Sequence, residues 1–317
     1  MTKEKQISVA IVGAGYMAKE HIRAFKDNPE ANICAIISQT RSKAEELASE
    51  FQIAEVHDSI ATMYDRTRAD LVVVTVPELA TNSVCKTCFK FPWTILVEKP
   101  VGYDLADAEE IEAQARTEGA RVFVGLNRRH YSSTIAVQQD LAMNDGMRFI
   151  YLQDQEDQNR ALQAGQPKKV VENWMFANSI HIIDYLSMFG RGNVKKINRI
   201  IPWNPNNPWV VLAHITFDSG DFGIYEGIWN SPGPWSASIQ IKHKRWELRP
   251  LEKASFQIAG SRQMESIELH AWDREFKPGL RLQADKAVAA VQGHNHDLPS
   301  LDESLKTMRL IHEIYRT

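Results

Sequence analysis

The sequence predicts an α/β protein, with a doubly wound parallel sheet in its N-terminal part and an α+β domain built on an open antiparallel sheet after it. Up to about residue 125, short apolar runs alternate with longer amphipathic segments, a pattern typical of right-handed βαβ units. Beyond that point, long stretches alternate at period two, as in strands with one buried face. Seven of the eight tryptophans lie beyond residue 170. We therefore expect two domains, 1–125 and 126–317.

The elements of the first domain follow from apolar runs and stop signals. Residues 7–12 are apolar enough to form a strand buried on both faces. A helix over 16–27 ends at Asn28-Pro29, because proline cannot continue it. Further strands are predicted at 33–37, 70–76, 94–97 and 121–125, and further helices at 42–51, 81–89 and 105–118.

In the second domain, residues 210–217 and 236–241 alternate as half-buried strands do. Clusters rich in proline, glycine and asparagine at 202–208 and 231–234 are typical of turns. A last helix is predicted at about 301–315. Tryptophans of this domain could stack on sugar rings, but we expect most of them to cover the sheet face, in the core or at a subunit interface. A homodimer or homotetramer is the expected assembly.

Composition excludes several classes of protein. The 317 residues are 44% hydrophobic and 24% charged with a formal charge of −3, which excludes disordered, collagen-like and coiled-coil chains. The absence of basic excess argues against nucleic acid as a partner. No apolar run approaches the length of a membrane helix, and the chain leads directly into its first strand without a signal peptide. Three cysteines form no disulfide framework, so we expect a cytoplasmic protein.

The segment Gly13-Ala14-Gly15-Tyr16-Met17-Ala18 joins the first strand to the first helix. Gly13 allows a tight turn, Gly15 lets a pyrophosphate approach the backbone, and Ala18 lets helix and strand pack closely. The phosphates would then lie at the helix N-terminus. The strand before and the helix after favour a dinucleotide site, although a tight turn without a ligand gives the same pattern. Tyr16 either packs beside the cofactor or is an exposed aromatic at the helix start.

The second strand is followed by Ser38-Gln39-Thr40-Arg41, without the carboxylate that usually binds the adenosine ribose of NAD. A hydroxyl followed by an arginine could hold a 2′-phosphate, since guanidinium matches phosphate oxygens in a two-pronged geometry. We therefore favour NADP(H) over NAD(H). The alternative is that Arg41 and Lys43 are solvated residues at the start of a helix.

The strand over 94–97 is followed by Glu98-Lys99-Pro100. In open α/β sheets, ligands bind just beyond the carboxyl ends of the strands. A lysine at this place would point at the nicotinamide end of a dinucleotide, where its charge can orient a substrate oxygen. A single lysine at a strand end is otherwise a solvated charge.

Taken in order, the glycine loop, the strand end at Val76-Pro77, Glu98-Lys99-Pro100 and Asn127-Arg128-Arg129 resemble the glucose-fructose oxidoreductase / inositol dehydrogenase / MocA family. The resemblance covers the first domain, continues around His181 and thins after about residue 200. It implies a Rossmann domain joined to an α+β domain with a large open, mainly antiparallel sheet. It also implies a nicotinamide cofactor and the oxidation or reduction of a sugar, cyclitol or related carbonyl compound.

The resemblance also implies site residues. Lys99 positions the substrate hydroxyl, and His181 and Asp184 match the family's catalytic histidine and a following acid. Arg129 and Tyr131 line the substrate cleft or form the interdomain contact. The cofactor would be bound by Gly13, Gly15, Tyr16, Met17, Ala18, Ser38, Thr40, Arg41, Val76, Pro77, Glu98, Lys99, Pro100 and Asn127.

Local sequence supports the role of His181. Asn178 or Ser179 could cap a helix that runs to about Phe189. His181 would lie in its first turn, where the helix dipole disfavours the imidazolium and leaves the ring available as a base. Asp184, three residues on, shares its face and could orient the ring or a substrate hydroxyl. A structural histidine at a helix start is the alternative.

One position departs from the family, in which many members carry an aspartate four residues before this histidine; here that residue is Ala177. The sequence predicts an NAD(P)-dependent oxidoreductase that transfers hydride between nicotinamide and a sugar, sugar-derivative or cyclitol, nucleotide-linked sugars included. Ala177 is the argument for the alternative, a catalytically inactive protein that senses a dinucleotide or sugar. We predict no metal site, because Cys85 and Cys88 are better explained by helix packing and His294–His296 by a polar loop.

Overall fold

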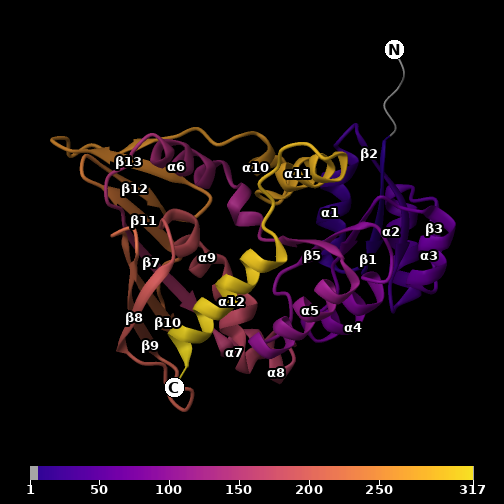
Figure 1. Ribbon diagram of the computed structural model, residues 1–317, viewed down its shortest axis with the longest axis horizontal. Coiled ribbons are helices and arrows are strands. Elements are labelled where there is room, and N and C mark those ends of the chain that lie inside the picture. Colours follow the sequence, from indigo (N-terminus) through magenta and orange to yellow (C-terminus); the bar gives the residue numbers. More distant parts are fainter. Residues whose placement is uncertain (1–5, 317) are drawn as a thin grey trace. The chain divides into compact units, whose positions relative to one another are not determined.

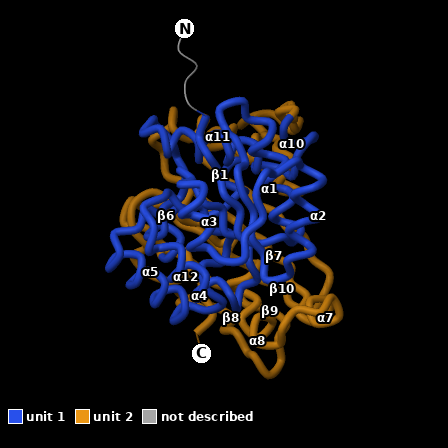
Figure 2. The backbone as a smooth tube through the Cα atoms, turned by 90° about the vertical axis from the view of Figure 1, so that its right-hand side faces the viewer, with its two compact units in different colours: residues 1–130, 272–305 blue, residues 131–271, 306–317 orange. Residues whose placement is uncertain are grey.

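The computed structural model describes residues 6–316, which form two compact units (Figure 2). The first unit comprises the chain up to His130 together with Trp272–Leu305. The second comprises Tyr131–Ala271 and the chain from Lys306 onward. The start of the chain, on which the expectation of no signal peptide rests, lies outside the described residues.

The first unit contains the predicted parallel sheet. Its strand order is β3-β2-β1-β4-β5-β6, and every neighbouring pair is parallel. The chain order reverses between β1 and β4, so the segments that follow these two strands leave the sheet edge in opposite directions, and ligands bind at such a place in open α/β sheets. The strands are β1 Ile7–Val12, β2 Ala31–Ile37, β3 Glu55–His57, β4 Leu71–Val74, β5 Thr94–Glu98 and β6 Arg121–Gly125. The helices between them are α1 Tyr16–Lys26, α2 Arg41–Phe51, α3 Ile60–Thr67, α4 Glu78–Cys88 and α5 Leu105–Glu118 (Figure 1).

Residues 272–305 were predicted to belong to the second domain, but in the structure they belong to the first unit. They contain the short α10 (Trp272–Glu275) and α11 (Leu280–Gln292), which packs against α1. The apolar face of α11 is part of the same core as β1 and α1. An amphipathic pattern shows that a helix is half-buried but does not say against which domain. The boundary at residue 125 also moves slightly, because the first unit continues through a 3₁₀ turn, Asn127–His130.

The second unit is built on the predicted open sheet, with eight strands in the order β14-β13-β12-β11-β7-β10-β9-β8. Only β7 and β10 run parallel, and the other neighbours are antiparallel. The strands are β7 Phe149–Glu156, β8 Val194–Ile201, β9 Val210–Phe217, β10 Phe222–Trp229, β11 Ser236–Ile241, β12 Lys244–Leu248, β13 Ala254–Ile258 and β14 Glu265–Ser266. The helices are α6 Ser132–Ala142, α7 Gln158–Gln163, α8 Lys168–Glu172 and α9 Ile180–Phe189, together with the part of α12 (Leu301–Tyr315) from Lys306 onward (Figure 1).

Side chains alternate between buried and half-buried along β7, β9 and β10. On the buried face, Tyr225 and Trp229 contact Tyr315 of α12. The tryptophans mostly belong to the core, as expected, since Trp203, Trp229 and Trp246 are buried, while Trp209 is exposed. The opposite face carries half-buried aromatic side chains, among them Phe149, Tyr151 and Phe222.

Two further expectations can be compared with the structure. Cys85 and Cys88 are fully buried in α4, as packing predicts, and burial raises the pKa of the Cys88 thiol to about 12. Among residues 6–316, no helix is both long and apolar enough to cross a membrane.

Candidate active site

The glycine loop has the backbone geometry that its sequence predicts. Gly13 has φ +113°, and a Cβ atom there would lie 2.6 Å from the carbonyl oxygen and from Oγ1 of Thr75. Only glycine therefore allows β1 and β4 to approach this closely. At Gly15, in contrast, the space around a Cβ atom would be open to a distance of 4 Å.

The start of α1 offers donors to an anion. Gly15 is the N-cap residue of α1, and no side chain caps the helix. The backbone N–H groups of its first turn, at Tyr16, Met17 and Ala18, therefore face the open side of the loop without a capping group. A helix N-terminus with free N–H groups and a bare glycine in front of it fits the pyrophosphate of a dinucleotide.

Next to Arg41 lies a carboxylate that the sequence prediction missed. Ser38 and Thr40 follow β2, and Arg41 begins α2. The Arg41 guanidinium bonds Glu45 at 2.8 Å and also Asp58. Asp58 follows β3, which pairs with β2 so that Ile37 and His57 are neighbours in register. The segment after β3 thus brings a carboxylate to the residues that follow β2, a relation that only strand pairing reveals.

The turn after β5 is fixed from within the first unit. Glu98 accepts or shares a hydrogen bond at 2.6 Å with Nε2 of His21, a buried residue of α1. Lys99 is half-buried, and the Lys99–Pro100 peptide bond is cis. Glu98, predicted to bind cofactor, therefore bonds to α1, and His21 is a further residue that the sequence analysis did not single out.

The strand ends on either side complete this edge of the sheet. β4 ends at Val74, two residues earlier than predicted, and Pro77 is the N-cap residue of α4. Val76 is half-buried and Pro77 is exposed. After β6, the buried Asn127 donates from Nδ2 to the carbonyl oxygen of Pro278 at 2.9 Å, which ties the strand end to the returning segment.

The returning segment also brings a cation to the glycine loop. Nζ of Lys277 lies 5.5 Å from the ring centroid of Tyr16, which is 64% exposed. Beside it, Nη2 of Arg23 donates to the carbonyl oxygen of Glu275 at 3.0 Å. No local motif marks Lys277, and its position depends on residues 272–305 folding back onto α1.

The two residues predicted to line the substrate cleft belong to different units. Nη1 of Arg129 bonds Glu303 at 3.2 Å inside the first unit. Tyr131 begins the second unit as the N-cap residue of α6 and is buried.

In the second unit, the expectation that Asn178 or Ser179 caps a helix is wrong. The helix does not start there, because a π-helical turn, Met175–Ser179, runs directly into α9. Ser179 has helical backbone angles and makes no capping hydrogen bond. The argument that His181 lies in a first turn next to unsatisfied N–H groups therefore no longer applies. Asparagine and serine favour caps, but here their side chains have another partner, Glu156.

His181 and Asp184 are both buried on α9, with exposed fractions of 6% and 1%. Oδ1 of Asp184 accepts a hydrogen bond at 2.8 Å from Oγ1 of Thr307 on α12. Ala177 lies in the π-helical turn and is also buried. The histidine, the acid and the departure from the family pattern thus share one continuous helical segment.

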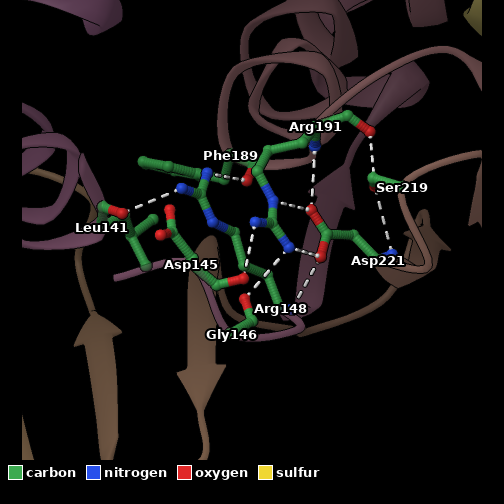
Figure 3. A network of polar contacts seen from close by, with 8 residues as sticks. All are labelled: Leu141, Asp145, Gly146, Arg148, Phe189, Arg191, Ser219 and Asp221. Carbon is green, nitrogen blue, oxygen red and sulfur yellow. Dashed lines mark hydrogen bonds and ion pairs between the residues drawn. The ribbon is translucent and has the colours of Figure 1, made fainter. Parts of the chain in front are cut away.

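The other end of α9 is held by two arginines (Figure 3). Arg148 donates at 2.8 Å to the carbonyl oxygen of Phe189, the last residue of α9. It also donates at 2.9 Å to the carbonyl oxygen of Leu141, the next-to-last residue of α6. The Arg191 guanidinium binds both oxygens of the buried Asp221 at 2.7 and 2.9 Å. The start of β7, the end of α9 and the start of β10 are thereby joined at one place.

Comparison with known proteins agrees with this geometry. Residues 7–126 match the description "Oxidoreductase family, NAD-binding Rossmann fold". This part of the chain is therefore similar to the glucose-fructose oxidoreductase / inositol dehydrogenase / MocA family. Inositol 2-dehydrogenase of Streptomyces avermitilis is 30% identical over 126 residues, which are 39% of this chain and 37% of that protein. The chain therefore spans little more than a third of that relative.

The whole fold recurs in solved structures. A dehydrogenase from Chromobacterium violaceum aligns with a TM-score of 0.83 at 19% identity, over 98% of this chain and 94% of that one. UDP-N-acetylglucosamine 3-dehydrogenase GnnA from Acidithiobacillus ferrooxidans aligns with a TM-score of 0.78 at 13% identity, over 98% and 96% of the two chains. At such identities the likeness shows a common fold, with a parallel Rossmann sheet followed by a mostly antiparallel one.

Proposed function

We propose that the protein is an NAD(P)-dependent oxidoreductase that transfers hydride between nicotinamide and a hydroxyl or carbonyl carbon of a sugar, sugar derivative or cyclitol. The observation that carries the proposal is the uncapped N-terminus of α1 behind Gly13 and Gly15, at the point where the strand order reverses. The family match of residues 7–126 and the likeness to inositol 2-dehydrogenase support the substrate class.

The chain's own residues have distinct roles in this proposal. The N–H groups at the start of α1 bind the pyrophosphate. Lys99 orients the substrate oxygen, and its charge stabilises negative charge that develops there. His181 exchanges the hydroxyl proton, as the ordinary imidazole pKa near 6.5 allows. Asp184, on the same helix face, supports His181. When bound, the nicotinamide supplies the hydride chemistry.

We further propose that NADP(H) is preferred, because Arg41 stands at the adenosine end of the site. Its guanidinium is shared with Glu45 and Asp58, so a 2′-phosphate must compete with these carboxylates. Arg41→Ala should weaken NADP(H) binding about tenfold and NAD(H) binding little. Asp58→Asn should free the guanidinium and tighten NADP(H) binding. Titration calorimetry of both cofactors tests both changes, and a tighter Kd for NAD+ than for NADP+ in the unaltered protein would refute the preference.

The activity is tested first by cofactor binding and then by turnover. A cofactor present at 100 times its Kd should raise the free energy of unfolding by about 2.7 kcal/mol, which thermal unfolding detects. A panel of inositols, free aldoses and nucleotide-linked sugars is then followed by absorbance of the reduced nicotinamide. His181→Ala should abolish turnover and leave cofactor affinity unchanged. Cofactor binding without turnover of any substrate class would point instead to a sensor, the alternative suggested by Ala177.

We also propose that the half-buried face of the large sheet binds a second copy of this chain. Phe149 and Phe222 lie 4.9 Å apart on it, and Tyr151 bonds Glu226 beside them. Partly exposed aromatic side chains on a sheet face are typical of interfaces between subunits. Light scattering at micromolar concentration should give at least a dimer, and Phe222→Arg should lower the mass. A monomeric mass for the unaltered protein contradicts this assembly.

A further inference from the structure

Two carboxyl groups lie side by side in the interior of the second unit. Asp154 and Glu156 are two residues apart at the end of β7, so their side chains point to the same face of the sheet. Their exposed fractions are 0% and 1%. In the described part of the chain, the hydrogen bonds to both groups come from neutral donors, and no cation is among the groups that shift the pKa of either carboxyl. Two buried negative charges without a counter-ion would be very costly.

The donors to Glu156 all come from one short segment. Nε1 of Trp174 lies 2.7 Å from Oε2 of Glu156. Nδ2 of Asn178 lies 3.0 and 2.9 Å from its two oxygens, and Oγ of Ser179 lies 3.3 Å from Oε1. Glu156 therefore binds the π-helical turn along its length, from Trp174, the residue before it, to Ser179, its last residue. His181 follows this turn by two residues.

Asp154 lies on the same face of the sheet, but its hydrogen-bond donor comes from β10, next to α12. Its Oδ2 accepts from the hydroxyl of Tyr225 at 2.7 Å, and that hydroxyl lies 2.6 Å from the hydroxyl of Tyr315. Trp229 donates to the Tyr315 oxygen at 3.1 Å. Burial raises the pKa of both phenols, so both remain neutral donors over the physiological range. The titratable side chains of α9 are His181, Asp184 and Tyr185, all of them buried, and the Tyr185 hydroxyl pairs with Oγ1 of Thr134.

The remaining oxygen of Asp154 accounts for the charge. Among the described residues, Oδ1 of Asp154 has no donor in good hydrogen-bond geometry, although the neutral Ser179 hydroxyl and Trp235 indole lie near enough to lower the pKa of the carboxyl against the effect of burial. Burial raises the pKa of both carboxyls, and the proximity of Asp154 raises the pKa of Glu156 further. A proton between the two groups would supply the missing donor and remove one of the two charges, as in other carboxyl pairs that cannot both ionise. The single charge that remains lies beside Trp174, at the start of the continuous helical segment that contains the π-helical turn and α9, where the helix dipole favours a negative charge.

We propose that Asp154 and Glu156 share one proton and that Glu156 is a positioning residue for His181, acting through the π-helical turn Met175–Ser179. The second part rests on the proposed function; the first part does not. π-helical turns are rare and often found at functional sites, because their hydrogen bonding is less favourable than that of an α-helix. Here Glu156 supplies, from a neighbouring strand, a carboxylate next to the segment in which Ala177 has none. Loss of the shared proton would add a second buried charge and loosen the turn that orients the histidine.

The shared proton is tested without any substrate. Infrared difference spectra between neutral and alkaline pH should contain the C=O band of a protonated carboxylic acid in the unaltered protein. The band should disappear in both Asp154→Asn and Glu156→Gln. Glu226→Gln, on the opposite face of the same sheet, is the matched control and should retain it. Absence of the band at neutral pH in the unaltered protein overturns proton sharing, even if neither variant folds.

The positioning role is tested on His181 itself. Imidazole resonances of His181, assigned with His181→Gln, should titrate with a pKa displaced by about half a unit or more in Glu156→Gln. Once a substrate has been identified, kcat of Glu156→Gln should be about tenfold or more lower than that of the unaltered protein, while KM and the Kd of the cofactor remain unchanged. An unchanged His181 titration in a folded Glu156→Gln refutes the positioning role. Failure of the unaltered protein to bind any nicotinamide cofactor would instead refute the proposed function and leave the infrared result standing.

Discussion

The two ends of α9 are both held by buried carboxylates, but in opposite ways. At the C-terminal end, Asp221 is bound by the Arg191 guanidinium and by the backbone N–H groups of Arg148 and Arg191 (Figure 3). At the N-terminal end, Asp154 and Glu156 have only neutral donors in the described part of the chain. One end is an ion pair, and the other is a carboxyl pair.

The arrangement of strands and helix explains the contrast. β7 and β10 are parallel, and α9 runs back along them, so the helix C-terminus meets the strand starts and its N-terminal side meets the strand ends. The last carbonyl groups of a helix attract cations, which Arg148 provides. The N-terminal side attracts a negative charge but tolerates only one when buried. One end of α9 is therefore a fixed, ion-paired anchor, whereas the proposed proton sharing makes the other end sensitive to protonation.

The largest loss of stability is expected from replacing Asp221, which anchors the C-terminal end of α9. Burial alone would raise the pKa of Asp221, but hydrogen bonds from Arg191 and from backbone N–H groups lower it below its ordinary value. Asp221→Ala leaves these donors without an acceptor and should lower the free energy of unfolding by about 3 kcal/mol, discounted because Arg191 is partly exposed. Urea unfolding measures the change. Asp145→Ala, an exposed acid near the same arginines, should cost less than about 0.5 kcal/mol; equal losses in the two variants would show that the anchor is not an ion pair.

A smaller effect is expected from the helix cap. Arg148→Met keeps the length of the side chain but removes the donors to Phe189 and Leu141. Two carbonyl groups at helix ends then lack their partner, so the free energy of unfolding should fall by about 1 to 2 kcal/mol. Hydrogen exchange should increase in the last turns of α6 and α9 and remain unchanged in the π-helical turn. Faster exchange in that turn as well would mean that the two ends of α9 are not independent.

The pH dependence of stability should have opposite signs at the two ends, with an amplitude of about 1 kcal/mol at each. A lowered carboxyl pKa stabilises the fold above the unfolded value of about 3.9, so the advantage of the unaltered protein over Asp221→Asn should vanish as pH falls through the native pKa of Asp221. Raised carboxyl pKa values stabilise the fold below about 4.3. The advantage over Glu156→Gln should therefore shrink as pH rises toward the raised value. Urea midpoints across pH test this, and parallel curves contradict it.

Cofactor affinity should change least of all when the residues that hold α9 are replaced. Asp221→Asn and Glu156→Gln alter the second unit only, so the Kd of the preferred cofactor should change by less than about twofold. Lys277→Ala removes the cation beside Tyr16 and should weaken cofactor binding by about fivefold. Calorimetry at two salt concentrations measures both, and the Lys277 effect should diminish at high salt. A salt-independent loss would contradict an electrostatic role.

The fold was largely predictable because its strongest signals are local. Continuous apolar runs predicted β1 and β6, and the helical stripe predicted α5, at the bounds that the structure has. Period-two alternation predicted the bounds of β9 and β11, but the expectation of one buried face holds only for β9, because β11 is buried on both faces apart from Gln240. These patterns report burial on one or both faces, which depends little on what the partner is.

The site was predictable only where a motif carries it. Gly13 and Gly15 follow from chain geometry alone, but His21 and Asp58 become neighbours of the site through packing and strand pairing. The role of Asn178 was misjudged, because a polar residue before an apolar run looks like a cap whether or not a distant carboxylate binds it. Glu156 gave no signal, since alternation along β7 only places it on the buried face.

The discontinuity of the first unit has a consequence for how the protein is made. Its core includes Leu280, Ala284 and Val288 of α11, so a ribosome that has just released residue 130 has supplied only part of that core. At roughly 5 to 20 residues per second, the missing helix is synthesised about 8 to 30 seconds later, after the strands of the second unit. Until then, the nascent Rossmann sheet presents an uncovered apolar face beside α1, which is where a chaperone would be expected to bind during synthesis.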